Sequence, residues 1–393
     1  MRRKVLSFVS ALALLILLGA AIPPVGRAAV TIVVGQNSVL CPGAQFAKIQ
    51  DAVNAASAGD SIQICPGTYI EQVSITKPLQ LNGNNGAIIR PNNIAANSTG
   101  LASGQPIAAI ILVQDTTGVT IRNVIVDGVD NGISECAPDL IGVFYRNASG
   151  ELSHVAVRDV KLNSTLNGCQ SGSAVLVQSS NGVNSVVAIE ESSIHDYQKN
   201  GITANEVGTQ VTIEGNVVTG LGPTTGATQN GIQIGFGAAG SIRHNTVANH
   251  IWLPCVSLES CDFKSDDILV FQSNGVSVHH NAIGVSQTGI AIVGDQGQIF
   301  DNDVFDSQIF DGVELIGNEN TAERNHITHS DQAGVLIAGN ENIVRQNTIN
   351  ESALGVLKVA GSVGNVIANN SYFNSPIKLQ DPPETPGKAS PYR

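Results

Sequence analysis

Aromatic residues, methionine and closely spaced cysteines are scarce in this sequence. Aromatic residues make up 4% of the 393 residues, whereas glycine occurs 41 times, a composition typical of folds with many turns. A single methionine and the absence of any CxxC pair argue against a protein that handles soft metal ions. After residue 28, no apolar run is long enough to span a membrane.

Positive charge is also in deficit. The chain carries a formal net charge of −12 and has a pI of about 5.0. Nucleic acids and anionic membranes attract basic surfaces, so we expect neither as a partner. We expect the protein to be a monomer.

The first 28 residues have the pattern of a secretory signal peptide. Basic residues at positions 2–4 precede an apolar run from Val5 to Ile22, and small residues follow up to Ala28. We therefore expect cleavage there, and a soluble mature protein that is secreted, either extracellular or periplasmic. Six cysteines in an exported chain predict up to three disulfides rather than a metal cluster.

A short phrase repeats through residues 276–375. Its central asparagines follow one another at steps of 21, 23, 22 and 23 residues, at Asn281, Asn302, Asn325, Asn347 and Asn370. A fixed period of this length is typical of a stacked solenoid. We expect these asparagines to form a ladder inside the turn, bonded amide to amide, in the left-handed backbone conformation that Asn tolerates.

The residues of each repeat indicate the kind of solenoid. Short runs of Val and Ile alternate with period two between Gly, Asn, Asp and Ser, which predicts strands with turns between them. No stretch inside the repeats keeps helical spacing for ten residues, and β-branched residues dominate where a leucine-rich repeat would need leucines. The predicted fold class is all-β, a single-stranded right-handed parallel β-helix with strands about 4.8 Å apart.

An amphipathic cap helix is predicted for residues 44–58, with Phe46, Ile49 and Val53 on one face and Gly59 at its end. It would cover the first coil, whose open end would expose core and unpaired strand edges. The β-helix is predicted for residues 29–379, with its regular coils at 276–375, and a C-terminal tail is predicted for 380–393.

The segment from Phe46 to Glu71 reads F-x-x-I-Q-D-A-V-x-x-A-x-x-G-D-x-I-x-I-x-P-G-T-Y-x-E. It resembles the first coils of the pectate-lyase-like right-handed β-helix superfamily, which includes pectin methylesterases, several lyases and a periplasmic protein of nitrous-oxide-reductase maturation. With the coils, the resemblance covers nearly the whole mature chain. It implies a carbohydrate-binding or sugar-hydrolase type of parallel β-helix, and specifies the fold more than the activity.

Motifs that would specify a reaction are missing. Gly67, Tyr69 and Glu71 match the G-x-Y-x-E of pectin methylesterases, but the catalytic G-x-x-D-F-I-F-G strand is absent, so we interpret the match as structural. Only the D-D fragment of the polygalacturonase-like pattern occurs, at Asp266 and Asp267, and the epimerase-type D-P-H-D is absent.

Three disulfides are expected, one across the cap helix, one between adjacent long coils and one closing a tight loop. The expected pairs are Cys41 with Cys65, Cys136 with Cys169, and Cys255 with Cys261.

The coils before residue 276 are longer, and the longest insertion spans 248–266. Loops on a rigid scaffold often carry function. Trp252 would offer an apolar platform to a sugar ring. Lys264 could serve as a base beside Asp266 and Asp267 at a Ca²⁺ site, as lyase chemistry on uronates requires. Alternatively, Trp252 packs beneath its own loop and the charges are solvated.

Stacking of the coils predicts a second group beside the asparagine ladder. Side chains one coil apart lie about 4.8 Å apart, so Asp301 is expected between His280 and Arg324, and Asp303 beside His326. Such carboxylates could act as acid and base on a glycosidic bond, with the cationic side chains binding substrate.

Two further acids belong to this hypothesis. Glu314 projects from the next strand as a substrate-binding candidate, and Asp311 precedes it. Asp301, Asp303 and Asp311 could instead supply oxygen ligands to Ca²⁺. The histidine pairs could bind a transition metal, although no third ligand follows from the sequence. Surface charge ladders that satisfy one another are the structural alternative.

Three functions remain open at this point. The first is an exported enzyme, a lyase or hydrolase of acidic glycans, for which Ca²⁺ would bridge an acidic protein to an acidic polymer. The second is a non-catalytic protein that binds polysaccharide or a cell-surface glycan. The third is a periplasmic metal-handling accessory protein, which the histidines permit and the lack of Cys and Met clusters disfavours.

Overall fold

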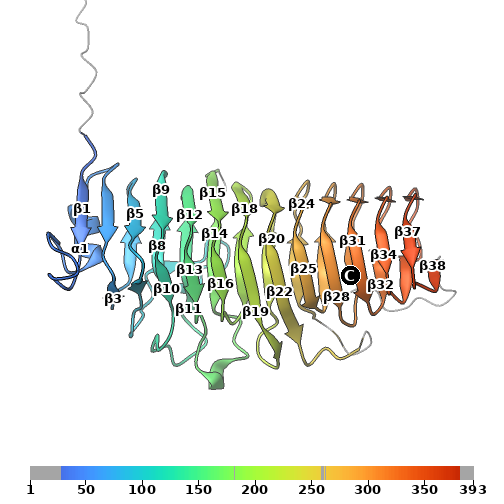
Figure 1. The fold of residues 1–393 in the computed structure, drawn as a ribbon, viewed down its shortest axis with the longest axis horizontal. Coiled ribbons are helices and arrows are strands. Elements are labelled where there is room, and N and C mark those ends of the chain that lie inside the picture. Colours follow the sequence, from blue (N-terminus) through green and yellow to red (C-terminus); the bar gives the residue numbers. More distant parts are fainter. Residues whose placement is uncertain (1–27, 181, 258–260, 262, 381–393) are drawn as a thin grey trace, which may run out of the picture.

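The computed structural model describes residues 28–180, 182–257, 261 and 263–380, which form one elongated parallel β-helix (Figure 1). The predicted signal peptide, apart from Ala28, and the predicted tail after Gln380 lie outside the described residues. Each coil contributes strands to three parallel sheets, so the predicted fold class is confirmed. Within the described residues, no helix is long and apolar enough to cross a membrane.

Sheet A runs along one side of the solenoid, with every neighbouring pair parallel. Its strands are β1 (Thr31–Val34), β2 (Ser61–Ile64), β5 (Gln80–Gly83), β9 (Val119–Arg122), β12 (Gly150–Ser153), β15 (Ser185–Glu190), β18 (Thr209–Glu214), β21 (Ala239–Arg243), β24 (Ser277–His279), β27 (Gln298–Phe300), β30 (Thr321–Glu323), β33 (Ile343–Arg345) and β36 (Val366–Ala368).

Sheet B follows sheet A in each complete coil, after the turn that holds the asparagine ladder. Its strands are β3 (Gly67–Tyr69), β6 (Ala87–Ile89), β10 (Ile125–Asp127), β13 (Ala156–Arg158), β16 (Ser193–His195), β19 (Val217–Thr224), β22 (Thr246–Trp252), β25 (Ala282–Ser286), β28 (Asp303–Ser307), β31 (His326–Ser330), β34 (Thr348–Asn350) and β37 (Ser371–Phe373).

Sheet C completes the coil. Its parallel strands are β4 (Val73–Ile75), β8 (Pro106–Gln114), β11 (Asp139–Arg146), β14 (Ser173–Gln178), β17 (Asn200–Asn205), β20 (Asn230–Gly235), β23 (Asp266–Phe271), β26 (Thr288–Val293), β29 (Val313–Ile316), β32 (Ala333–Ile337), β35 (Leu354–Lys358) and β38 (Ile377–Gln380). The short β7 (Ser98–Thr99) pairs antiparallel with β8, and a 3₁₀ turn, η1, spans Ser164–Leu166.

The inward side chains of the three sheets form one continuous apolar core. In β23, Ile268 and Val270 belong to this core, whereas Leu269 between them faces outward, as period-two alternation requires. Outward residues of β8, β11 and β14 form a separate apolar cluster on the outer face of sheet C. Other parts of the chain therefore cover some of the outer face of sheet C, the face that carries the site described below.

The asparagine ladder forms as predicted. Asn281 Nδ2 donates to Asn302 Oδ1 at 2.9 Å, and Asn302 Nδ2 donates to Asn325 Oδ1 at 2.9 Å. The ladder begins at Asn216 and ends at Asn370. Each amide also donates to a backbone carbonyl, as Asn302 does to Val278 at 2.9 Å, so these buried polar side chains are satisfied.

The backbone prediction for the ladder was wrong in one respect. The left-handed conformation belongs to the residue before each asparagine, with φ of 57° at His280, 55° at Asp301 and 53° at Arg324. The asparagines themselves keep negative φ. The bend one residue earlier turns the asparagine side chain inward, where it reaches the carbonyls of the coil before it.

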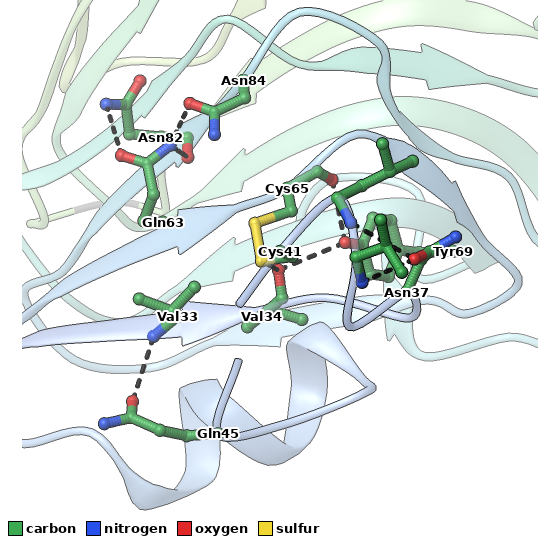
Figure 2. Close-up of a disulfide and its surroundings, with 12 residues drawn as sticks. Val33, Val34, Asn37, Cys41, Gln45, Gln63, Cys65, Tyr69, Asn82 and Asn84 are labelled. Carbon is green, nitrogen blue, oxygen red and sulfur yellow. Dashed lines mark hydrogen bonds between the residues drawn. A yellow bond between two sulfur atoms is a disulfide. The ribbon is translucent and has the colours of Figure 1, made fainter. Parts of the chain in front are cut away.

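The cap helix is shorter than predicted. Helix α1 covers Ile49–Ala55 instead of 44–58, because Gln45 and Phe46 are held by strand β1. The N–H of Gly35 donates to the carbonyl of Phe46 at 2.9 Å, and Val33 N–H donates to the Gln45 side chain at 3.1 Å (Figure 2). The carboxylate of Glu71 accepts the N–H groups of Ile49 and Gln50 at the start of the helix.

This arrangement gives the G-x-Y-x-E match a structural role, as interpreted. Glu71 caps α1, and the hydroxyl of buried Tyr69 donates to the carbonyl of Cys65 at 2.8 Å (Figure 2). Cys65 in turn forms the expected disulfide with Cys41.

All three disulfides form in the expected pairs, with Cα–Cα distances of 6.0 Å for Cys41–Cys65, 5.3 Å for Cys136–Cys169 and 4.7 Å for Cys255–Cys261. The described residues contain no free cysteine. Three disulfides indicate an oxidising compartment outside the cytoplasm.

The insertion predicted at 248–266 is partly strand. β22 continues to Trp252 and β23 begins at Asp266, and the described residues between them, 253–257, 261 and 263–265, belong to no helix or strand. β22 is long because it pairs with β19 across a register shift between Thr219 and Gly222. The two extended strands project beyond the regular edge of sheet B (Figure 1).

Candidate functional site

A cleft of about 710 Å³ lies over the outer face of sheet C in the middle of the solenoid. β20 and β23 form its floor, the end of β22 forms one wall, and the loops before β14 and β20 contribute Gln170, Gly226 and Thr228. The long middle coils thus enclose this space between their loops and the outer face of sheet C. The prediction that the long loops carry function pointed to this region, but it did not identify the strand residues that form the floor.

The floor presents side-chain amides. In β20, Ile232 and Ile234 enter the core, while Asn230 and Gln233 lie on the side of the cleft. Gln233 Nε2 donates to Asn205 Oδ1 on β17 at 3.2 Å, and Asp266 N–H donates to Asn230 Oδ1 at 3.1 Å. These bonds hold the amides in fixed orientations on a rigid sheet, which favours directional recognition of hydroxyl groups.

The walls are aromatic. Trp252 is half-buried, and its Nε1 donates to the carbonyl of Gly226 at 2.9 Å, which fixes the indole ring. Phe236 and Phe271 pack edge to face with ring centroids 5.5 Å apart, and exposed Phe263 completes the set. Trp252 therefore lines the cleft, as the sugar-platform hypothesis requires, and is also anchored to its neighbouring loop.

Lys199 enters the cleft just before β17 and was missed by the sequence analysis. Its Nζ donates to the carbonyl of Thr228 at 2.6 Å. Burial lowers the pKa of Lys199 to about 8, against an opposing influence from the charge of Asp266. Nothing in the sequence distinguishes this lysine, because its position depends on two loops that meet only in the fold.

A buried cluster of one lysine and three acids adjoins the cleft. Lys264 lines the cleft, and its Nζ lies 2.5 Å from Glu314 Oε1, 3.2 Å from Asp266 Oδ1 and 2.7 Å from Thr288 Oγ1. Asp311, two residues before β29, interacts with Glu314 and Lys264. Lys264, Asp266 and Glu314 were candidates on separate grounds, and the structure brings them together with Asp311.

The charges of this cluster are unequal. Burial opposes the charge of Lys264, but Asp266 and Glu314 outweigh it and raise its pKa. Burial, and then the charge of Glu314, raises the pKa of Asp311 well above its ordinary value. Within the described residues, Asp311 Oδ2 and Glu314 Oε2 have no hydrogen-bond donor, although both atoms are buried. A proton kept on Asp311 would relieve the repulsion between the two carboxyl groups.

Asp267, predicted as a catalytic residue together with Asp266, does not belong to this cluster. Adjacent residues of a strand point to opposite faces, so Asp267 enters the solenoid interior while Asp266 faces outward. It occupies a column that holds Gly231 in the coil before and Gly289 in the coil after. The larger side chain fits because it bonds to His250, whose Nδ1 lies 2.5 Å from Asp267 Oδ1.

His250 continues this interior chain to Tyr197, whose hydroxyl lies 2.5 Å from His250 Nε2. All three side chains are fully buried. Burial lowers the pKa of His250 to about 3, and raises those of Tyr197 and Asp267 well above their ordinary values. His250 is therefore neutral at physiological pH, and the chain fills the core beneath the cleft without opening into it.

Two of the pairs predicted beside the asparagine ladder form, whereas the described residues show no bond between Asp301 and His280, and all of these residues lie away from the cleft. Arg324 makes two bonds to Asp301, both at 2.9 Å, and His326 Nδ1 lies 2.9 Å from Asp303 Oδ1. His280 Nδ1 lies 2.9 Å from its neighbour, His279 Nδ1. These pairs lie at the turn between sheets A and B and on the adjoining strands of the two sheets.

The predicted combination of these residues with Glu314 and Asp311 is therefore wrong, because the latter two lie on sheet C. Because Asp311 lies on the sheet C side, away from Asp301 and Asp303, these three residues cannot bind one Ca²⁺ ion together as predicted. Across the described residues, no group of three or more His, Cys, Asp and Glu side chains is placed to hold a metal ion.

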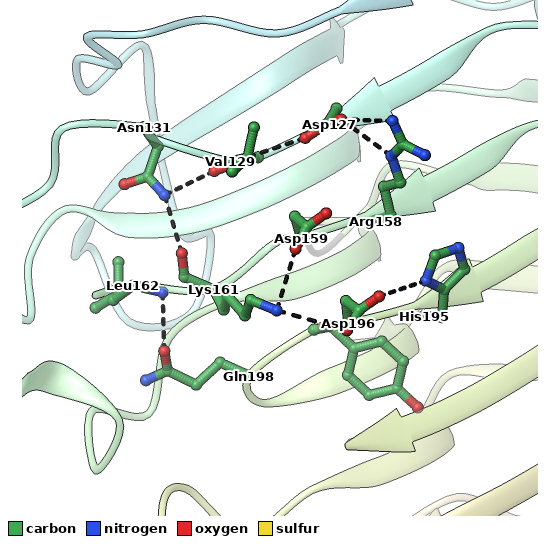
Figure 3. A network of polar contacts seen from close by, with 12 residues as sticks. Asp127, Val129, Asn131, Arg158, Asp159, Lys161, Leu162, His195, Asp196 and Gln198 are labelled. Atoms are coloured by element: carbon green, nitrogen blue, oxygen red, sulfur yellow. Dashed lines mark hydrogen bonds and ion pairs between the residues drawn. The ribbon is translucent and has the colours of Figure 1, made fainter. Parts of the chain in front are cut away.

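A further polar network lies on sheet B of the earlier coils (Figure 3). Buried Asp127 accepts a hydrogen bond from Arg158 at 2.9 Å, which the figure shows, and another from Arg90 at 2.7 Å. Lys161 lies 3.1 Å from Asp159 and 3.5 Å from Asp196, within the same view. The charges satisfy one another, so we assign this network to stabilisation of the coils.

Comparisons with known proteins agree on the fold. Residues 255–373 match the family described as right handed beta helix region. The structure resembles a lacto-N-biosidase from Eubacterium ramulus, with a TM-score of 0.59, 11% identity, and coverage of 89% of this chain and 68% of that one. It also resembles the Dettilon tailspike protein, with a TM-score of 0.57, 11% identity, and coverage of 82% and 63%. No curated protein matches the sequence. At this identity the likeness shows a shared right-handed β-helix.

Proposed function

We propose that this right-handed β-helix protein binds a glycan in the cleft on the outer face of sheet C. One observation carries the proposal: fixed aromatic side chains face a floor of oriented amides. A sugar ring presents apolar C–H faces to aromatic groups and hydroxyl groups to amides. Trp252 would take a ring face, and Asn230 and Gln233 would take hydroxyl groups.

Two further observations support a carbohydrate ligand. The cleft has the size range of ligand sites and lies on a rigid scaffold, as ligand sites commonly do. One structural neighbour on the same fold is a lacto-N-biosidase, which supports the proposal by analogy alone. The signal-like residues 1–28 and the disulfides suit an exported protein that meets polysaccharide or cell-surface glycan.

The test is binding of the mature protein, residues 29–393, to an array of plant, algal and bacterial glycans, followed by calorimetry on the ligands found. Trp252→Ala should weaken binding at least about fivefold, because stacking on an aromatic ring contributes roughly 1 kcal/mol or more. Phe305→Ala is the matched control, since Phe305 is an exposed aromatic residue on β28, away from the cleft. Binding unaffected by Trp252→Ala, or no glycan bound at all, would overturn the proposal.

Hydrolysis of the bound glycan is a second candidate, which the cluster of Asp266, Asp311 and Glu314 favours. An acid that keeps its proton beside an ionised carboxylate is the pairing used to cleave glycosidic bonds. Asp311 is buried and is not among the residues that line the cleft, so it would donate its proton to the glycosidic oxygen, as the C–O bond breaks, only in a complex in which the ligand displaces Lys264. Glu314 would take a proton from the water whose oxygen bonds to the sugar carbon.

Asp311→Asn and Glu314→Gln test this second candidate. Each should reduce cleavage at least about a hundredfold while leaving binding unchanged, because general acid–base catalysis contributes that much or more. Products formed in ¹⁸O-water would be read by mass spectrometry, and Asp301→Asn is the control on the other side of the solenoid. Binding without cleavage by the unmodified protein would leave a binding protein and remove the hydrolytic role.

A further inference from the structure

The cleft is longer across the solenoid than along it. Among the described residues, the strand side chains that line it come from β20 and β23, together with Trp252 at the end of β22. Two neighbouring strands cover only about 10 Å along the solenoid, whereas the six residues of β23 place its two ends about 17 Å apart. A ligand that fills the cleft therefore lies along the strands and across the coils.

The outer face of sheet C is buried on both sides of the cleft. Towards the earlier coils, Leu176 belongs to the apolar cluster on that face, and towards the later coils Ala291 is fully buried. Lys264 marks the limit on this second side, because its Nζ bonds to Thr288 on β26 and lies 5.0 Å from the ring centroid of Phe310. A polymer laid along the solenoid axis would therefore find the floor covered at both limits.

Aromatic side chains lie at both ends of the path along the strands. Trp252 lies near the start of β20, where its Nε1 donates to the carbonyl of Gly226. Phe271 is the last residue of β23 and Phe236 follows the last residue of β20, so this edge-to-face pair marks the opposite end. The amide of Gln233 lies on the floor between the two ends.

Phe236 is exposed at a corner position that the neighbouring coils give to polar residues. It is 42% exposed, and its backbone has a φ of 56°. The register of β17, β20 and β23 places Glu206 and Gln272 at the same position, with φ of 78° and 53°. A bulky residue in this left-handed conformation costs free energy, and an exposed ring gains little from folding. Phe236 lines the cleft whereas Glu206 and Gln272 do not, which indicates that its ring serves the ligand.

We propose that Phe236 and Phe271 form a second sugar-binding subsite, and that the ligand is an oligosaccharide that lies across the coils from Trp252 to this pair. The inference rests on the glycan-binding function proposed above and names the length class and orientation of the ligand. A hexose unit with its bridging oxygen is about 5 Å long, given covalent bonds near 1.5 Å, so about three units span the path. A ring face would contact each aromatic end, and hydroxyl groups between them would face Gln233.

The test is a series of oligosaccharides from the disaccharide to the octasaccharide. The probes are cello-, manno-, xylo- and galacturonate oligomers, with size fractions of any other polysaccharide that the array identifies. Affinity measured by calorimetry should rise about fivefold or more at the trisaccharide or tetrasaccharide, where the oligomer first reaches the second aromatic end. It should change little beyond that length, since both ends are then occupied. Full affinity at the disaccharide, or a steady increase up to the octasaccharide, would overturn the inference and leave glycan binding standing.

Variants of Phe236 identify the second subsite. Phe236→Gln introduces the residue that the next coil has at this position, so the corner should fold. It should lose about fivefold or more in affinity for the tetrasaccharide and none for the disaccharide, whereas Phe236→Tyr keeps the ring and most of the affinity. Phe305→Gln is the matched control, because Phe305 is 41% exposed on β28, away from the cleft. Equal loss for both oligomers in Phe236→Gln would contradict the assigned role.

The fluorescence of Trp252 reports on the first end separately, because Trp252 is the only tryptophan in the chain. The tetrasaccharide at saturating concentration should change this emission in the unmodified protein and in Phe236→Gln alike, since the Trp252 end stays intact. Loss of the change in Phe236→Gln would show that the two ends are not separate subsites and would contradict the inference. If the unmodified protein binds no glycan at all, the proposed function fails, and this inference with it.

Discussion

The regular coils at residues 276–375 and the long coils before them share the same three sheets and differ in what surrounds them. In the regular coils, charged residues form exposed pairs across neighbouring coils, such as Arg324 with Asp301. In the long coils, loops and extended strands cover sheet C, and Lys264 and Asp266 are buried beside a cleft together with Glu314 of an adjoining regular coil. The scaffold is constant, and function depends on where its outer face is enclosed.

One column of sheet C shows the same contrast at a single register position. The outward residues Gln233, Leu269, Ala291, Glu314 and Leu336 follow one another from β20 to β32. The polar Gln233 lies in the cleft, whereas buried Glu314 stands between two apolar neighbours. A carboxylate in an apolar column needs a specific partner, and Lys264 reaches it from the loop before β23.

Removal of that partner should have the largest effect. Lys264→Met leaves buried Asp266 and Glu314 without their cation, and breaking a buried ion pair costs about 4 kcal/mol. Equilibrium urea denaturation at pH 7 should show this loss of unfolding free energy. Lys48→Met, at an exposed lysine, should change little. If both variants unfold alike, the buried cluster contributes no more than a surface charge.

The interior of the regular coils provides the next test. Asn302→Ala removes donors to Asn325 and Val278 and an acceptor for Asn281, and the unpaired buried groups should cost about 3 kcal/mol. Asn318→Ala is the exposed counterpart, because its amide bonds to Asp295 at the surface. Urea denaturation of the two variants should separate them clearly. Equal losses of unfolding free energy in the two variants would show that the asparagine ladder does not stabilise the coils.

Asp127 offers a test by pH within the long coils. Burial opposes its ionisation, but bonds from Arg90, the Val129 N–H and Arg158 lower its pKa below the ordinary value. A lowered folded-state pKa gives stability that is present above the unfolded pKa, about 4, and is lost as pH falls through the folded value. Asp127→Asn should therefore cost about 2 kcal/mol at pH 7.

The difference between Asp127→Asn and the unmodified protein should shrink below pH 4, where the unmodified carboxyl group also becomes protonated. Urea denaturation at several pH values would measure it. A difference that stays constant down to pH 3 would indicate lost packing instead of lost charge.

The sequence predicted what depends on the period of the repeat. The asparagine column, the strand alternation and the pairing of Asp301 with Arg324 all follow from stacking residues one coil apart. The cap helix was predicted too long because pairing of Phe46 with β1 depends on a contact outside the local pattern. Local spacing cannot indicate which of two structures a short segment joins.

The site could be predicted only in part for a related reason. Asp266 and Asp267 are adjacent in sequence, yet the strand sends them to opposite sides of the sheet. Lys199 is placed in the cleft by its bond to Thr228, a residue of another loop, so no motif marks it. In coils of irregular length, residues one coil apart cannot be aligned from the sequence as they can in the later coils. The cleft lies among those irregular coils.

The smallest expected effect is at the exposed pair of the regular coils. Arg324→Gln removes the cation from Asp301 at a surface position, where water and salt already screen the interaction. The melting temperature should change by no more than about 1 °C, and glycan binding should stay the same. Thermal denaturation in low and high salt would measure the first, and calorimetry the second. A large loss of glycan binding would return the site to the corner beside the asparagine ladder, and would contradict the assignment of function to the enclosed face of sheet C.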